Sequence, residues 1–230
     1  MPEKADLGEP YAAQWTRTRL CRLLRDYFRS ERGRPAEREG EPAVGPVRVG
    51  TDVVFHYDPA DRLARVTPDL YVIEGLGYEE QLRSFRVYER GLRPELVIHL
   101  VDTVVSPEDG LMMHFLRLGV RDVILYDPLW FSQPSKDPKG RRLLWHYRRE
   151  RLPSPNSTPS SGGPASSPAP LSGEVMRLQS QDHPGRVHLP RYKLWLIHRG
   201  SADLRVYVGE AGEPPAESEC LLLPEERTSV

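Results

Sequence analysis

A strand–helix–strand segment at residues 94–126 constrains the fold of this chain more than any other feature. Residues 94–101 are nearly all apolar and include β-branched side chains, which is typical of a central strand covered on both faces. A helix is predicted over 107–119 and a second strand over 123–126. A strand, helix and strand of these lengths most naturally form a right-handed parallel crossover, so the segment predicts an α/β fold.

The helix predicted inside this segment has recognisable end signals. Ser106 is a candidate N-cap, Pro107 suits the first turn, and Asp109 completes a pattern like a capping box. Gly119 is placed to end the helix. Leu111, Met112, Phe115 and Leu116 would supply its buried stripe.

The remaining chain divides into one domain with an insert and a tail. Residues 1–151 are interpreted as the core, with a helix over 11–28, a charged loop over 30–46, and strands and a helix over 52–147. Pro, Ser and Gly dominate residues 152–173, which predicts a disordered insert. Strands over 174–178, 192–198 and 203–208 are expected to complete the same domain (residues 174–208), followed by a flexible tail over 209–230.

Composition narrows the function classes. With a formal net charge of −1, the chain has no strongly basic field that would gather nucleic acid, although local arginine patches remain open. The two cysteines have no metal-ligand spacing. No secretory signal pattern and no stretch of ~20 apolar residues is present, so the sequence predicts a cytoplasmic protein without a membrane partner.

Two polar residues in apolar surroundings are the candidate site. Asp69 follows Pro68 at the start of an apolar run, and His99 interrupts the strand at 94–101. Taken alone, an aspartate at that position is a strand-entry turn residue, and a histidine inside an apolar strand is more often a satisfied core residue than a ligand.

The ordered set of motifs resembles the Uma-two family of restriction endonucleases, a branch of the PD-(D/E)XK nuclease superfamily. The matching residues are Thr67-Pro68-Asp69, Arg93-Pro94-Glu95-Leu96-Val97-Ile98, Gly119-Val120-Arg121-Asp122 and Tyr126-Asp127-Pro128, with Asp203-Leu204-Arg205-Val206-Tyr207 towards the end. The likeness covers about half of the chain. It implies a restriction-endonuclease-like core, with a mixed central β-sheet flanked by helices and the strands of Asp69 and His99 adjacent.

The resemblance also implies a degenerate active site. Asp69 matches the first metal ligand of the family, His99 stands where a glutamate belongs, and Leu111 to Met113 fill the region that would carry a lysine. The resemblance therefore makes Asp69 and His99 vestigial catalytic and metal-binding candidates, in a pseudoenzyme that needs no cofactor and serves as a binding or assembly module.

Two other functions remain open at this point. One is a divergent but active Mg²⁺- or Mn²⁺-dependent DNA endonuclease that takes a carboxylate from Glu74, Glu79, Glu80 or Glu95. The other is a structural protein–protein partner in which the cleft is packed shut. Candidate partners are nucleic acid, held by the arginines of the 11–28 helix or of residues 142–151, and a protein partner or a second copy of the chain.

Overall fold

The computed structural model describes residues 9–30, 45–78, 82–101, 110–128, 143–152, 173–179, 185–199, 203–212, 215–224 and 226. The helices are α1 (Glu9–Arg29), α2 (Val87–Arg90) and α3 (Leu111–Leu118), and 3-10 turns lie at Pro190–Tyr192 and Glu217–Glu219. The strands are β1 (Val47–Gly50), β2 (Val54–His56), β3 (Arg65–Val66), β4 (Leu70–Glu74), β5 (Ser84–Arg86), β6 (Leu96–Leu100), β7 (Asp122–Tyr126), β8 (Leu144–Arg151), β9 (Glu174–Leu178), β10 (Arg186–Leu189), β11 (Leu194–Arg199) and β12 (Asp203–Val208).

A six-stranded mixed sheet forms the centre of the molecule, in the order β1-β4-β6-β7-β8-β9. β6 and β7 are parallel, and the other neighbouring pairs are antiparallel. The chain between β6 and β7 contains α3, which confirms the predicted strand–helix–strand crossover and the α/β class. β4 and β6 are neighbours, as expected for the strands next to Asp69 and His99.

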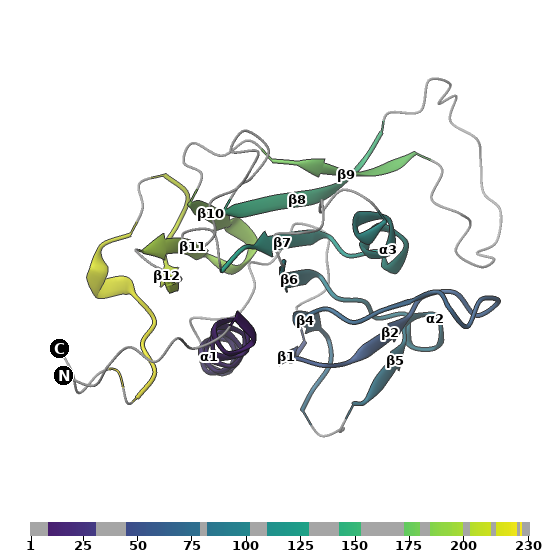
Figure 1. The fold of residues 1–230 in the computed structure, drawn as a ribbon, viewed down its shortest axis with the longest axis horizontal. Helices are drawn as coiled ribbons and strands as arrows, with labels where there is room; N and C mark the ends of the chain where they lie inside the picture. The colour runs from purple at the N-terminus through teal and green to yellow at the C-terminus, as the bar shows by residue number, and fades with distance from the viewer. Residues whose placement is uncertain are drawn as a thin grey trace.

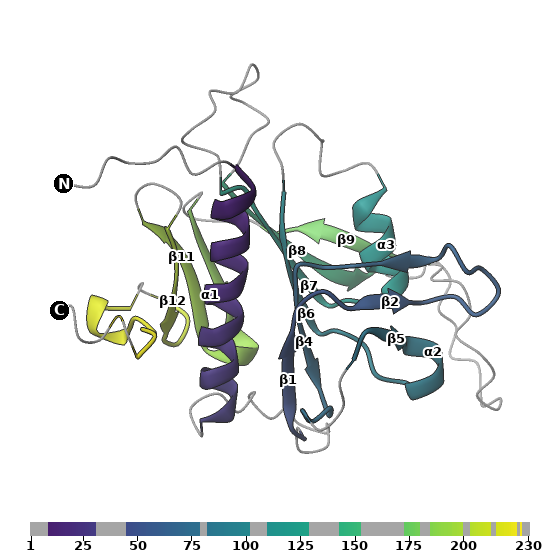
Figure 2. The same ribbon diagram turned by 60° about the horizontal axis from the view of Figure 1, so that its bottom comes forward.

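Two further layers cover the two faces of this sheet. On one face, α1 lies between the central sheet and the three-stranded sheet β10-β11-β12, as Figures 1 and 2 show. Their apolar side chains form one continuous core cluster. On the other face, α3 and the small sheet β3-β2-β5 pack around a second cluster. The predicted covering of the sheet by two helices is confirmed.

Side-chain spacing explains why α1 lies where it does. Its apolar residues recur at helical intervals and are all buried, with exposed fractions of 8% or less: Leu20, Leu23, Leu24, Tyr27 and Phe28. Cys21 is buried beside them, and burial raises the pKa of its thiol. The helix therefore packs by its apolar stripe, as the sequence predicts.

The start of α3 differs from the prediction. Gly110 has φ 87° and ψ −41°, so the backbone there is not helical and α3 begins at Leu111 rather than at 107. Residues 102–109, including the predicted Ser106 cap, lie outside the described residues. The C-terminal prediction is confirmed, because Gly119 adopts φ 82° and donates its N–H to the carbonyl of Leu116 at 3.0 Å.

The C-terminal region also differs from the prediction. Residues 192–193 belong to a 3-10 turn and its cap, so β11 starts at Leu194, and its pairing with β12 forms the predicted hairpin. Past Gly209, where a flexible tail is predicted, two described residues pack against the domain: Cys220 forms a bridge with Tyr207, and Leu223 is 5% exposed in the core. The predicted insert at 152–173 lies almost entirely outside the described residues, as does most of the loop at 30–46.

Candidate functional site

Asp69 and His99 meet at one end of the central sheet. Asp69 immediately precedes β4, and the antiparallel register pairs Leu70 with Ile98, which brings the preceding Asp69 beside His99. His99 Nδ1 lies 2.6 Å from Asp69 Oδ2, and the two side chains are 22% and 23% exposed. The predicted proximity is therefore confirmed.

The Asp69 carboxylate is surrounded by donors and positive charge. The backbone N–H of Leu100 donates to Oδ2 at 2.9 Å, and Arg17 Nη1 lies 3.8 Å from Oδ1. Burial would raise the pKa of this carboxyl, but the His99 contact, the Leu100 N–H and the Arg17 charge together lower it below its ordinary value. Asp69 is thus held as a carboxylate by groups of the protein itself.

Packing sets the orientation of the His99 ring. The ring stands edge-on to Phe115 of α3, with 5.9 Å between the centroids. Asp69 Oδ2 lies close to Nδ1 but off the direction of an N–H on that atom, so no well-aligned hydrogen bond forms. The packing against Phe115 therefore fixes the ring beside the Asp69 carboxylate.

These two residues do not make a magnesium site. Mg²⁺ prefers oxygen ligands in near-octahedral geometry, whereas the candidate pair supplies one carboxylate and one imidazole. Among the residues that the structure describes, no group of three or more His, Cys, Asp or Glu is placed to hold a metal ion. The Leu100 N–H and the nearby Arg17 guanidinium also compete with a cation for the carboxylate oxygens.

The alternative carboxylates Glu74 and Glu95 lie at the other end of the sheet. Glu74 is five residues beyond Asp69, and Glu95 is four residues before His99. At ~3.3 Å per residue these separations are about 16 and 13 Å along the strands. Glu74 is held by Arg191, whose Nε donates to Oε1 at 2.6 Å, while burial and the Glu74 charge raise the pKa of Glu95. Neither carboxylate completes the site at Asp69; Glu79 and Glu80 lie outside the described residues.

The helix face expected to carry a lysine holds a histidine–tyrosine pair instead. Leu111 is half-buried and Met113 is 49% exposed, while His114 Nδ1 lies 2.5 Å from the Tyr57 hydroxyl. Burial raises the pKa of Tyr57, so this hydroxyl stays protonated at neutral pH. Sequence reasoning missed this contact because 57 positions separate the two residues and no motif connects them.

A second polar cluster, also missed from the sequence, is buried between β7 and β8. Asp122 Oδ1 lies 2.8 Å from both His146 Nε2 and Arg148 Nε, and Asp122 and His146 are 4% and 5% exposed. Burial would raise the pKa of Asp122, but the contacts with His146 and Arg148 lower it. Since these groups satisfy one another, the cluster acts as an internal cross-link between strands.

The two arginine surfaces predicted from the sequence are largely engaged inside the molecule. On α1, Arg17 Nη1 contacts Asp52 Oδ1 at 2.7 Å, and Arg25 donates to the carbonyl of Val49 at 3.0 Å. On β8, Arg148 bonds to Asp122, and Arg149 lies 3.7 Å from Glu174. Most of these arginines therefore have a structural role.

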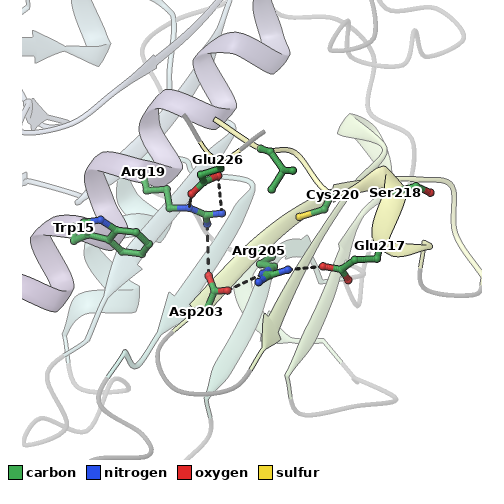
Figure 3. A pocket seen from close by; sticks show the side chains of 9 residues that line it. Trp15, Arg19, Asp203, Arg205, Glu217, Ser218, Cys220 and Glu226 are labelled. Atoms are coloured by element: carbon green, nitrogen blue, oxygen red, sulfur yellow. Dashed lines mark hydrogen bonds and ion pairs between the residues drawn. The ribbon is translucent and has the colours of Figure 1, made fainter. Parts of the chain in front are cut away.

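A pocket of about 700 Å³ lies between α1, β12 and the C-terminal 3-10 turn (Figure 3). Its charged side chains are paired with one another: Arg19 Nε bonds to Glu226 Oε1 at 2.7 Å, and Arg205 bonds to Asp203 and Glu217. Cys220 lines the pocket, but burial raises the pKa of its thiol and so opposes formation of the reactive thiolate. The pocket is large enough for a small molecule, and its charged side chains are engaged with one another.

Comparison with known proteins assigns this chain to no family. No family model matches the chain, and no curated protein matches it. Among the described residues, no helix has the length and apolar character needed to cross a membrane.

Proposed function

We propose that this chain is a restriction-endonuclease-like protein that has lost metal-dependent hydrolysis and acts as a module that binds nucleic acid without cutting it. The α/β architecture with a mixed sheet is compatible with such a core. One observation carries the proposal: the 2.6 Å contact between His99 Nδ1 and Asp69 Oδ2.

The chemistry of phosphodiester hydrolysis explains why this contact matters. The metal polarises a phosphoryl oxygen and lowers the pKa of the attacking water, and it requires a strongly negative ligand set. An imidazole in place of a carboxylate removes one negative charge and favours Zn²⁺, Ni²⁺ or Mn²⁺ over Mg²⁺. His99 therefore weakens the magnesium affinity of the site and occupies the carboxylate that remains.

The lack of an ammonium group on α3 is a second defect. Its residues are Leu111-Met-Met-His-Phe-Leu-Arg-Leu118, without a lysine. Loss of one preorganised electrostatic partner of a transition state typically reduces the rate by about 10²–10³. Two such losses in one site leave little hydrolysis, whereas binding of a phosphate backbone needs only positive surface charge.

A cleavage assay tests this function. The purified protein, incubated with plasmid and single-stranded DNA in Mg²⁺ or in Mn²⁺, should cut no more than its Asp69→Ala variant. Metal-dependent cleavage that disappears in Asp69→Ala would overturn the proposal and favour the active endonuclease. Absence of both cutting and nucleic-acid binding would favour the structural protein–protein partner instead.

A further inference from the structure

A row of basic side chains crosses the small sheet β3-β2-β5. His56 of β2 stands opposite Arg65 of β3 in an antiparallel pair and opposite Arg86 of β5 in a parallel pair. The three residues therefore occupy one cross-strand line. Because neighbouring strands lie about 4.8 Å apart, the backbone positions of Arg65 and Arg86 are about 10 Å apart.

This row lies on the outer face of the small sheet. Phe55 and Phe85, which alternate with His56 and Arg86, are 0% and 1% exposed and belong to the core cluster beneath α3. Successive side chains of a strand point to opposite faces, so the basic row points away from that core. Arg65 and Arg86 are accordingly exposed, and His56 is half-buried.

Little in the structure neutralises the row. Arg86 forms a surface ion pair with Glu89 at 2.8 Å, with side chains 58% and 51% exposed, and such pairs exchange readily for another anion. Arg65 makes no ion pair with any residue that the structure describes. The nearby acids Asp58 and Asp61 accept backbone N–H groups of their own turn, from Ala60 and Leu63. Arg62 and Arg83, next to the row in sequence, are also exposed.

We infer that the outer face of the β3-β2-β5 sheet, centred on Arg65, His56 and Arg86, binds the sugar–phosphate backbone of a nucleic acid. A line of spaced guanidinium groups on a flat sheet matches a chain of regularly spaced phosphates, and Arg forms bidentate bonds with phosphate. The inference rests on the proposed function and names its binding surface. We place the binding surface here rather than on α1 or β8, because arginines of those elements such as Arg25 and Arg148 bond to part-buried groups of the chain itself.

Contacts through α3 show how the small sheet is placed relative to the candidate site. The residue after His56 is Tyr57, whose hydroxyl contacts His114 of α3. The next helix residue, Phe115, packs against His99. Thus the inner face of the small sheet packs on the side of the central sheet that carries the Asp69–His99 contact, while the basic row on its outer face points to solvent.

Salt-dependent binding tests the inference. Binding of the full chain to a fluorescent DNA duplex and to the matching single strand is measured in EDTA between 50 and 200 mM salt. The Arg65→Gln/Arg86→Gln variant should reduce the slope of log affinity against log salt by about 1.8 on duplex and about 1.4 on single strand, since each phosphate contact contributes about 0.9 or 0.7. Glu89→Gln, which frees Arg86, should strengthen binding.

Arg151→Gln/Arg177→Gln is the matched control, because it removes two exposed arginines from β8 and β9 and should leave the slope unchanged. Melting temperatures of all variants check folding. If the wild type binds and the two double variants behave alike, the surface is wrong while the proposed function stands. If the wild type binds no nucleic acid, both fail. The assignment to nucleic acid would be overturned, in favour of an acidic protein partner, if the chain bound polyglutamate as tightly as DNA and this binding also required Arg65 and Arg86.

Discussion

Replacing His99 by glutamate should introduce charge repulsion at the Asp69 contact. In the wild type, Nδ1 lies 2.6 Å from Asp69 Oδ2. Two carboxylates about 4 Å apart would repel by about 4 kcal/mol at an effective dielectric constant of about 20. Both side chains are about one-fifth exposed, and solvent and side-chain relaxation reduce this to about 2 kcal/mol. For a chain of this length, the expected fall in melting temperature is about 4–8 °C.

Divalent cations should reverse the loss, because the variant restores the two carboxylates that a Mg²⁺ site needs. A cation at a hundred times its Kd stabilises the folded state by about 2.7 kcal/mol. The assay is thermal unfolding of wild type, His99→Glu and His99→Gln with EDTA and with Mg²⁺. His99→Gln removes the imidazole without adding charge, so it isolates the repulsion. The reasoning is refuted if His99→Glu and His99→Gln have the same melting temperature and neither is stabilised by Mg²⁺. It is also refuted if Mg²⁺ already stabilises the wild type through Asp69.

The same contact predicts how acid affects stability. The Asp69 carboxyl has a lowered pKa in the folded chain, so its contribution is present above the unfolded pKa and is lost as pH falls through the lower folded value. His99→Gln removes the contact that contributes most to lowering the pKa of Asp69. Unfolding experiments between neutral and acid pH should therefore show a shallower loss of stability in His99→Gln than in the wild type.

Three further predictions concern the rest of the molecule. Asp122→Asn should reduce the free energy of unfolding by about 3 kcal/mol in urea melts, because it removes the charge that His146 and Arg148 share; a change within ±0.5 kcal/mol would show that the cluster is not an energetic cross-link. Leu223→Ala should cost about 2–4 kcal/mol, because this residue is 5% exposed in the core; an unchanged stability would restore the prediction of a flexible tail. Replacing residues 152–173 with a short Gly/Ser link should change the melting temperature little, because loop-closure entropy depends only on the logarithm of loop length; a large fall would show that the segment packs.

Local pattern determined the elements with strong periodicity. The apolar stripe at Leu20 to Phe28 predicted α1, and the apolar run before His99 predicted a central strand. Burial of these side chains depends on spacing along one helix or one strand, which the sequence contains in full. The family resemblance of the ordered motifs also implied that the strands of Asp69 and His99 are adjacent, and the antiparallel pairing of β4 with β6 brings the two residues together.

Tertiary structure alone decided which polar groups meet across the chain. Tyr57 reaches His114, Asp122 reaches His146 and Arg148, and Leu223 packs into the core because the sheets and helices bring distant segments together. The pairing of the small sheet could not be predicted from the sequence, although the strand candidate over residues 52–57 contains β2. Strands as short as Arg65–Val66 show no clear alternation, and only pairing with β2 aligned Arg65 with Arg86. The sequence by itself determined which faces of its longer elements are apolar. The contacts between elements determined which charged side chains are paired inside the molecule and which lie exposed on its surface.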